Sequence, residues 1–324
     1  MSRFPAVRLR RLRANERSRR TVRETRVPPS SLILPVFVDP TVRRPQGLPA
    51  LPALTRHPPE ALLPLARRAE RAGLGGLLLF GRPRRKDPEG TGAWDEAGAV
   101  PRALRSLRSR TRLLLVADVC LCAYTTDGHC GYWKEGEVEN DRSLVGLARA
   151  AVTYARAGAD WLAPSAMLDG QVRAVREALD AAGYAGRAIL AYSAKSASAF
   201  YDPFRDVEDS SPRQGDRRGY QMDYGNPREA LREMALDMEE GADLVMVKPG
   251  LPQLDLLARA RERFPLPLAV YQVSGEYAMM KDAAVAGHLD ESRAVPEVLT
   301  AFRRAGADVI LTYYALEAVE QGWI

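Results

Sequence analysis

The segment Ala157-Gly-Ala-Asp-Trp-Leu-Ala-Pro164 joins the end of a helical pattern to a short apolar run. A glycine at the end of a helix, followed by a polar residue that leads into a strand, is what short αβ loops require. The same four residues recur as Ala305-Gly-Ala-Asp308, again directly before an apolar run. This recurrence predicts that the chain repeats one helix-then-strand unit.

The unit can be followed outward from this segment in both directions. Strands are expected at the apolar runs 31–38, 75–80, 112–119, 161–164, 188–192, 244–247, 268–271 and 309–312. Helices are expected before the last seven, at 60–72, 99–108, 143–156, 171–182, 227–240, 254–264 and 292–304. Strands this apolar indicate a parallel sheet that helices cover on its faces. Eight strands, with no G-x-G-x-x-G after any of them, favour an α/β fold of the (β/α)8 TIM barrel type over a doubly wound sheet.

Two segments depart from the repeat. Residues 40–59 are rich in proline and are expected to be irregular, and Pro35 removes a ladder donor from the first expected strand. Residues 200–221 show no clear periodicity and mix aromatic side chains with arginines. They suit a lid over an anionic ligand, at about 199–221, because a guanidinium group matches a carboxylate. A solvated loop whose arginines pair with its own acids is the alternative.

The basic character of the chain is confined to its N-terminus. The net charge is +6, but residues 1–27 hold ten arginines and two glutamates, or +8, so the other 297 residues carry −2. We interpret residues 1–27 as an arm and residues 28–324 as one catalytic barrel domain. A basic arm can bind nucleic acid or reach a partner subunit. The subunit is favoured and no nucleic acid is expected, because the body shows no basic stripe with interleaved aromatic residues.

Neither a membrane nor secretion is indicated. No apolar run approaches the roughly 18 to 20 residues that span a bilayer. The N-terminus lacks the apolar core of a signal peptide, and clustered thiols suit a reducing compartment. We therefore expect a cytoplasmic protein.

All three cysteines lie in one stretch, Asp118-Val-Cys-Leu-Cys-Ala-Tyr-Thr-Thr-Asp-Gly-His-Cys130. Three thiols cannot all pair as disulfides within one chain, whereas three thiolates and an open position make a zinc site of the catalytic kind. Three buried core cysteines are the alternative, but core cysteines would not be expected to cluster within eleven residues. Cys120, Cys122 and Cys130 are therefore predicted zinc ligands. His129 offers a fourth ligand, which would close the site.

Lysine is rare in this chain, and its positions are informative. Only five of the 47 basic residues are lysines, and Lys195 and Lys248 lie where adjacent expected strands end. Active sites of this fold gather at the C-terminal ends of the strands. Two amines in an apolar pocket lower each other's pKa toward the neutral nucleophile, although each lysine alone can instead pair with a carboxylate. The other polar residues at strand ends are Asp118, Ser165, Ser193, Ser274 and Tyr313.

Several long motifs resemble those of the porphobilinogen synthases, also called 5-aminolevulinate dehydratases. Besides the cysteine stretch, they are Ala-Pro-Ser-Ala-Met-Leu-Asp-Gly (163–170), Gly-Asp-Arg-Arg-Gly-Tyr-Gln-Met (215–222), Met-Val-Lys-Pro (246–249) and Tyr-Gln-Val-Ser-Gly-Glu-Tyr-Ala-Met (271–279). The resemblance covers residue 8 to nearly the end. It implies the condensation of two 5-aminolevulinate molecules into porphobilinogen with loss of two waters, a step toward haem and other tetrapyrroles.

The resemblance also implies roles for individual residues. Lys248 would hold, as an imine, the substrate that supplies the propionate side of the pyrrole, with Ser274 and Tyr313 at its carboxylate. Lys195 would bind the second substrate, toward which the zinc would keep its open position. The remaining implied residues, which bind substrate or transfer protons, are Asp118, Ser165, Tyr201, Arg205, Arg217 and Gln221.

Two departures from the family pattern lie near the second substrate. Arg205 and Arg217 are implied to bind its carboxylate, but Asp202 stands where glycine is usual and can reorient Arg205. Ser196 follows Lys195 where the family commonly has phenylalanine.

Regulation and assembly are implied by the resemblance as well. Some members carry a regulatory magnesium whose acidic contact corresponds to Glu233, although an exposed helix carboxylate explains this residue equally well. The family's N-terminal arm embraces a neighbouring subunit in a homo-octamer, which agrees with the charge of residues 1–27.

Two other functions fit the same residues. A class I aldolase needs a single Schiff-base lysine and would keep its activity after metal chelation. A barrel with a structural zinc and a basic arm would bind nucleic acid in a salt-sensitive way.

Overall fold

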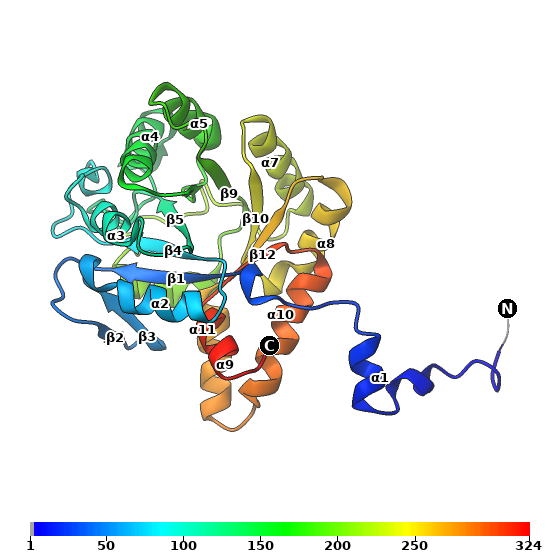
Figure 1. The fold of residues 1–324 in the computed structure, drawn as a ribbon. Helices are drawn as coiled ribbons and strands as arrows, with labels where there is room; N and C mark the ends of the chain where they lie inside the picture. Colours follow the sequence, from blue (N-terminus) through cyan, green and yellow to red (C-terminus); the bar gives the residue numbers. More distant parts are fainter. Residues whose placement is uncertain (1–2) are drawn as a thin grey trace.

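The computed structural model describes residues 3–324, and within them eight parallel strands close into a barrel (Figure 1). The barrel order is β1-β4-β5-β8-β9-β10-β11-β12, and β12 pairs with β1. The bounds are β1 Leu32–Val38, β4 Gly76–Gly81, β5 Leu114–Val119, β8 Trp161–Pro164, β9 Ala188–Lys195, β10 Leu244–Lys248, β11 Leu268–Gln272 and β12 Val309–Thr312. Each strand coincides with an expected apolar run to within three residues at either end, so the predicted (β/α)8 barrel is confirmed.

Helices surround the barrel and bury its outer face (Figure 1). The seven expected ones are α2 Leu63–Arg71, α3 Ala99–Leu107, α4 Asn140–Ala157, α5 Gln171–Ala181, α7 Pro227–Glu239, α8 Leu254–Arg263 and α10 Glu291–Ala305. Two more, α9 Ser274–Val285 and α11 Ala315–Glu320, follow the last two strands. Along residues 3–324, no helix combines the length and the apolar character needed to cross a membrane.

The repeated Ala-Gly-Ala-Asp segment has the same structure in both copies. Gly158 and Gly306 end helices α4 and α10 in the left-handed conformation, with φ of 114° and 118°. The aspartate that follows then ties two strands together, because Asp160 accepts a hydrogen bond from the Leu115 N–H (2.9 Å) and Asp308 from the Leu268 N–H (3.0 Å). The repeated segment therefore links neighbouring strands at the N-terminal end of the barrel.

The expectation that residues 40–59 are irregular was wrong. They contain an antiparallel pair, β2 Gln46–Leu48 and β3 Leu51–His57, which extends the sheet through β1. The prolines are tolerated because this pair lies at an edge of the sheet. Pro35 is tolerated inside β1 because the pairing with β12 covers only Leu32 and Ile33.

The expected lid also has more regular structure than its sequence suggested. It contains helix α6, Asp202–Glu208, which is too short to show a helical period. Proline at the start of a helix lacks only a donor that would be unpaired there anyway, so Pro203 favours this helix. A second hairpin, β6 Tyr132–Lys134 with β7 Glu137–Glu139, follows the cysteine stretch.

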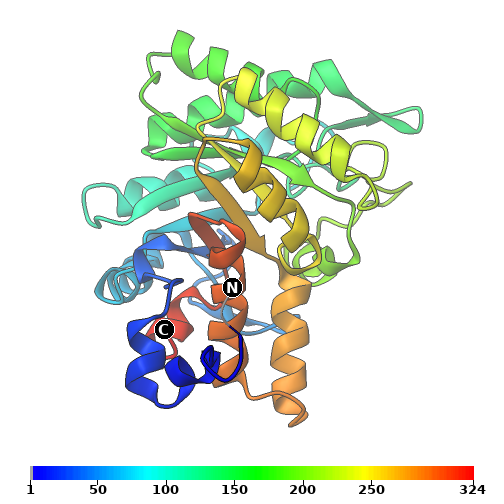
Figure 2. The ribbon, with the colours of Figure 1, turned by 90° about the vertical axis from the view of Figure 1, so that its right-hand side faces the viewer.

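The N-terminal residues leave the barrel as an arm, which extends sideways in Figure 1 and toward the viewer in Figure 2. It contains a 3-10 turn, η1 Leu9–Arg13, and helix α1 Glu16–Thr21. None of residues 3–27 is buried. The side chains of Phe4, Leu9 and Leu12 are left exposed, at 74%, 71% and 58%. Apolar exposure of this kind suits a surface that another chain covers.

Candidate active site

The predicted catalytic residues meet at the C-terminal ends of the strands. Lys195 ends β9, Lys248 ends β10, and the two residues are register partners on adjacent parallel strands. A cavity lies between these strand ends and the segment 199–221. Of the predicted catalytic and substrate-binding residues, those that line it are Asp118, Ser165, Lys195, Tyr201, Arg205, Arg217, Lys248, Ser274 and Tyr313.

The cavity is small because the segment 199–221, which we now call the lid, closes it. Its volume is about 30 Å³. Small-molecule sites have volumes of roughly 300 to 1,000 Å³. With the lid in this position, the cavity is too small for a molecule of ordinary ligand size.

Aromatic rings surround the amine of Lys248. Its Nζ lies 4.4 Å from the ring centroid of Tyr271, 4.9 Å from that of Tyr192 and 5.2 Å from that of Tyr201. Burial, and then the charge of Lys195, lowers the pKa of Lys248 to about 7. A large fraction of the amine is therefore neutral and nucleophilic near pH 7. The sequence analysis missed Tyr192 and Tyr271 as site residues, although both are aromatic residues near the ends of expected strands.

Asp118 and Ser165 lie beside the two lysines. The Oδ1 atom of Asp118 is buried without a hydrogen-bond partner. Loss of solvent raises the pKa of Asp118 to about 6, against the opposing effects of the charges of Lys195 and Lys248 and of a hydrogen bond from Ser165. Lys195 donates a hydrogen bond to the main-chain oxygen of Ser165. A carboxyl group that is neither fully ionised nor fully protonated near neutrality can take up or release a proton beside the amines.

The three cysteines form a compact cluster at the same end of the barrel. Their Sγ atoms all lie within 4.8 Å of one another, and those of Cys120 and Cys122 are 3.4 Å apart. A tetrahedral zinc ion with bonds of about 2.3 Å holds its sulfur ligands roughly 3.8 Å apart. Hydrogen bonds from Cys120 and Cys122, and the charge of Arg217, keep the pKa of Cys130 well below its ordinary value. The cluster therefore fits one thiophilic metal ion.

His129 does not contribute a ligand to this cluster. Its Nδ1 lies 3.1 Å from the Tyr220 hydroxyl, and its Nε2 lies 2.8 Å from the main-chain oxygen of Gln214. The ring also stacks on Trp133 with centroids 3.9 Å apart. Both nitrogens are thus engaged with the lid, so the candidate ligands of this cluster are the three sulfur atoms.

The second half of the lid packs on the cysteine loop. Arg217 is 5% exposed and donates hydrogen bonds to the main-chain oxygens of Gly128 (2.9 Å) and Ser210. The main chain adds a bond from the Arg213 N–H to the Asp127 oxygen, at 2.9 Å. The cysteine loop and the lid therefore form one packed unit.

The first half of the lid is positioned by Ser274 and by an internal ion pair. The Ser274 hydroxyl donates to the Phe200 oxygen (3.2 Å) and accepts from the Phe204 N–H (3.1 Å). Arg205 pairs with Asp202 at 2.8 Å, so the acid that departs from the family pattern does contact this arginine. The second departure, Ser196, is buried and accepts a hydrogen bond from Gln253.

Gln221 and Glu233 lie outside the cavity. Gln221 is 2% exposed, and neither its amide oxygen nor its amide nitrogen has a partner. With Glu233 it lines a separate acidic hollow of about 780 Å³. Burial, and then the charge of Asp169, raises the pKa of Glu233 to about 6.

Sequence reasoning did not single out Glu276, which holds two catalytic loops together. Its buried carboxylate accepts hydrogen bonds from the N–H groups of Gly250 (3.2 Å), Leu251 (2.7 Å) and Val273 (2.7 Å). The first two donors follow Lys248, and the third precedes Ser274. Glu276 lies in the first turn of α9, a helix that was not itself expected, so an acid shortly after the expected strand 268–271 was the available signal.

A barrel with two buried lysines on adjacent strand ends, one of them with a pKa near 7, has the arrangement that an enzyme of the Schiff-base class needs. The cysteine cluster at the same mouth has the geometry to hold a metal ion. The chain belongs to the delta-aminolevulinic acid dehydratase family, whose model matches residues 6–321. The resemblance seen in the motifs is thereby confirmed.

Individual relatives match over nearly their whole length. The delta-aminolevulinic acid dehydratase of Archaeoglobus fulgidus is 48% identical over 322 residues, which cover 99% of each chain. That of Streptomyces coelicolor is 48% identical over 319 residues, 97% of this chain and 96% of the relative. The crystal structure of the Toxoplasma gondii enzyme in complex with its reaction product porphobilinogen matches with a TM-score of 0.94 and 45% identity. That match covers 97% of this chain and 91% of the other.

Proposed function

We propose that this protein condenses two molecules of 5-aminolevulinate into porphobilinogen, with loss of two waters, as a porphobilinogen synthase. The observation that carries the proposal is the register pairing of Lys195 and Lys248 beneath a cavity that arginines and hydroxyls line. Family membership supports it. The reaction belongs to the biosynthesis of haem and other tetrapyrroles.

Lys248 is the proposed nucleophile toward the first substrate. Its neutral amine adds to the ketone carbon, and loss of the carbonyl oxygen as water leaves an imine. The rings of Tyr192, Tyr201 and Tyr271 limit access of water to this bond. Ser274 and Tyr313, which line the same cavity, bind the substrate carboxylate through their hydroxyls.

Lys195 and the lid are proposed to hold the second substrate. Arg205 and Arg217 present guanidinium groups from the lid, and each can form two parallel hydrogen bonds with a carboxylate. Asp118 and Ser165 lie where they can move protons as amines and carbonyls react. Tyr201 and Gln221 complete the proposed set, with Gln221 acting from outside the cavity.

Zinc is the metal that we propose for Cys120, Cys122 and Cys130. Three thiolates with one open position are the donor set of a catalytic zinc site, and bound zinc supplies a Lewis acid. We also propose that Glu233 contacts a regulatory magnesium ion, since its hollow contains further acids such as Asp169 and Glu229.

Trapping with borohydride in the presence of 5-aminolevulinate tests the catalytic proposal. Reduction should fix the mass of the substrate on Lys248, and the purified protein should form porphobilinogen. Lys134→Met is the matched control and should trap normally, because the Lys134 side chain is more than half exposed and pairs with Glu139. A protein that neither traps the substrate nor forms product contradicts the proposal.

Two further measurements separate the alternative functions. A class I aldolase would stay active after chelation, whereas the proposed enzyme should lose activity and regain it with zinc. A nucleic-acid-binding arm would give salt-sensitive binding that disappears when residues 1–27 are deleted.

We propose a homo-octamer in which the arm contacts a neighbouring subunit, in the cytoplasm and without membrane or nucleic-acid partners. The exposed apolar side chains of the arm support this assembly. Size-exclusion chromatography with light scattering, with pH and magnesium varied, should show an octamer for the full chain. Deletion of residues 1–27 should yield smaller particles, and an unchanged mass would contradict the role of the arm.

A further inference from the structure

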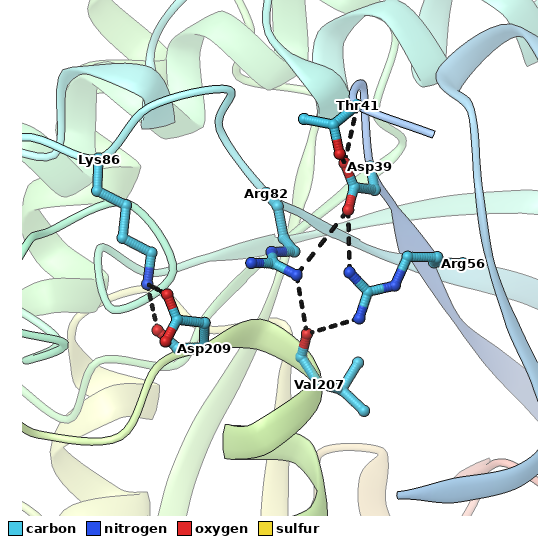
Figure 3. A network of polar contacts seen from close by, with 7 residues as sticks. All are labelled: Asp39, Thr41, Arg56, Arg82, Lys86, Val207 and Asp209. Carbon is cyan, nitrogen blue, oxygen red and sulfur yellow. Dashed lines mark hydrogen bonds and ion pairs between the residues drawn. The ribbon is translucent and has the colours of Figure 1, made fainter. Parts of the chain in front are cut away.

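Three cationic side chains from outside the lid hold the C-terminal end of lid helix α6 (Figure 3). Arg56 in β3 and Arg82 after β4 both donate hydrogen bonds to the main-chain oxygen of Val207, at 3.1 Å and 3.3 Å. Lys86 donates to the main-chain oxygen of Asp209, and its Nζ lies 3.1 Å from the Oδ2 of the same residue. We call Arg56, Arg82 and Lys86 the lid seat.

Asp39, directly after β1, orients the two arginines of the lid seat (Figure 3). Its Oδ2 lies 3.0 Å from an Nη of Arg56 and 3.9 Å from an Nη of Arg82. Its Oδ1 accepts from the N–H and the hydroxyl of Thr41, at 2.8 Å and 2.6 Å. Asp39 is 3% exposed, so this carboxylate is fixed to the barrel on one side and directs both guanidinium groups toward the lid on the other.

The lid seat acts at the point where a helix attracts cations. The last main-chain oxygens of a helix have no partner within it and carry a partial negative charge. Val207 is the penultimate residue of α6, and the two guanidinium groups satisfy its oxygen. Arg56 contacts Asp39 with one nitrogen and Val207 with the other, so it connects the barrel to the lid by itself.

The position of the lid seat determines where the arginines that are proposed to bind substrate lie. Arg205 belongs to α6, two residues before Val207. Ser210 follows the helix, and its main-chain oxygen accepts a hydrogen bond from Arg217. Neither Asp39 nor any of the three lid-seat residues lines the active-site cavity. The seat can therefore affect substrate only through the lid.

We infer that Asp39, Arg56, Arg82 and Lys86 are positioning residues that hold the lid closed and thereby set the affinity for the second substrate. The kinetic part rests on the proposed function, whereas the seating of the lid does not. Because the closed cavity holds only about 30 Å³, substrate entry requires the lid to lift. We expect the contacts of the lid seat to break when the lid lifts and to re-form when it closes.

Hydrogen exchange of the lid amides tests the seat without any turnover. In Arg56→Gln combined with Arg82→Gln, amides of residues 202–212 should exchange about tenfold to a hundredfold faster, as expected for the loss of one or two charge-assisted hydrogen bonds. Arg102→Gln is the matched control, since Arg102 forms two hydrogen bonds with Glu60 and does not touch the lid. Lys86→Met provides a second variant on a surface loop, should the double variant fail to fold. Unchanged lid exchange in the folded variants overturns the inference.

Steady-state kinetics test the consequence for substrate. The double variant should raise the KM for the second substrate about tenfold or more, while trapping of the first substrate at Lys248 stays unchanged. Arg56→Lys should recover only part of the affinity for the second substrate that the double variant loses, because one ammonium group cannot reproduce the forked contact with Asp39 and Val207. Faster lid exchange with an unchanged KM overturns the link to substrate. If the wild-type protein formed no porphobilinogen, the proposed function would fail, yet hydrogen exchange would still report on the seat.

Discussion

Lys195 and Lys248 face each other as register partners at the ends of adjacent strands. Neighbouring strands lie about 4.8 Å apart, so the two side chains enter the same space. A second positive charge in a buried space is unfavourable, and Lys195 adds to the effect of burial in lowering the pKa of Lys248 to about 7. Burial, together with the strand pairing that brings Lys195 close, thus makes a neutral amine available.

Lys195→Met should move the reactivity of Lys248 to higher pH. In the wild type, the neutral amine becomes populated as pH rises through about 7, so trapping of 5-aminolevulinate on Lys248 should increase between pH 6 and pH 8. Without the charge of Lys195, burial acts alone, and the midpoint should rise by about one pH unit. Mass spectrometry of the borohydride-reduced protein gives the profile. A midpoint that stays in place or falls would refute the electrostatic coupling.

Cys122→Ala should abolish tight metal binding. The substitution leaves two of the three sulfur atoms that lie within 4.8 Å of one another. Since even the loss of an outer partner of a metal ligand costs about 10-fold to 100-fold in affinity, loss of a ligand should cost at least as much. Elemental analysis after dialysis measures the bound metal. Wild-type protein stripped with a chelator should regain zinc and activity, whereas the variant should regain neither.

Glu276→Gln should reduce both stability and catalysis. The amide has one acceptor oxygen where the carboxylate has two, so at least one of three buried N–H groups loses its partner. Such a loss costs about 1 to 3 kcal/mol. Urea unfolding measures the stability, and kcat reports the displacement of the loop after Lys248. The exposed acid in the same helix offers a control, Asp282→Asn, which should change neither quantity.

Asp237→Asn should stabilise the protein more at pH 8 than at pH 5. Asp237 is 3% exposed with an unpartnered Oδ2, and burial raises its pKa from 3.8 to about 7. Between these two values the folded state binds the proton and the unfolded state does not, so this residue lowers stability as pH rises toward 7. The amide of asparagine does not ionise, so the substitution removes that loss of stability. The gain in the free energy of unfolding should be about 2 kcal/mol larger at pH 8 than at pH 5. Urea unfolding at both pH values measures it, and equal gains would contradict the raised pKa.

Local features of the sequence sufficed to predict the barrel and to place its candidate catalytic residues. The Ala-Gly-Ala-Asp repeats predicted how helices end and strands begin, because a helix cap is formed by residues close in the chain. The barrel fold then placed Lys195 and Lys248 at its mouth, since strand ends are visible as the limits of apolar runs. The cysteine cluster was equally visible, because its members lie within eleven residues.

Contacts between distant residues were decided only by the tertiary structure. In the lid seat, Arg56 and Arg82 contact Val207, which lies 151 and 125 residues further along the chain. No sequence pattern predicts contacts between residues this far apart. Glu276 reaches Gly250 across 26 residues, and Gln221 lines a separate hollow although Arg217, four residues earlier, lines the cavity. Local patterns determine hydrogen bonding and burial within each unit. The contacts between side chains of different helix-and-strand units depend on closure of the barrel and on how the lid packs over it.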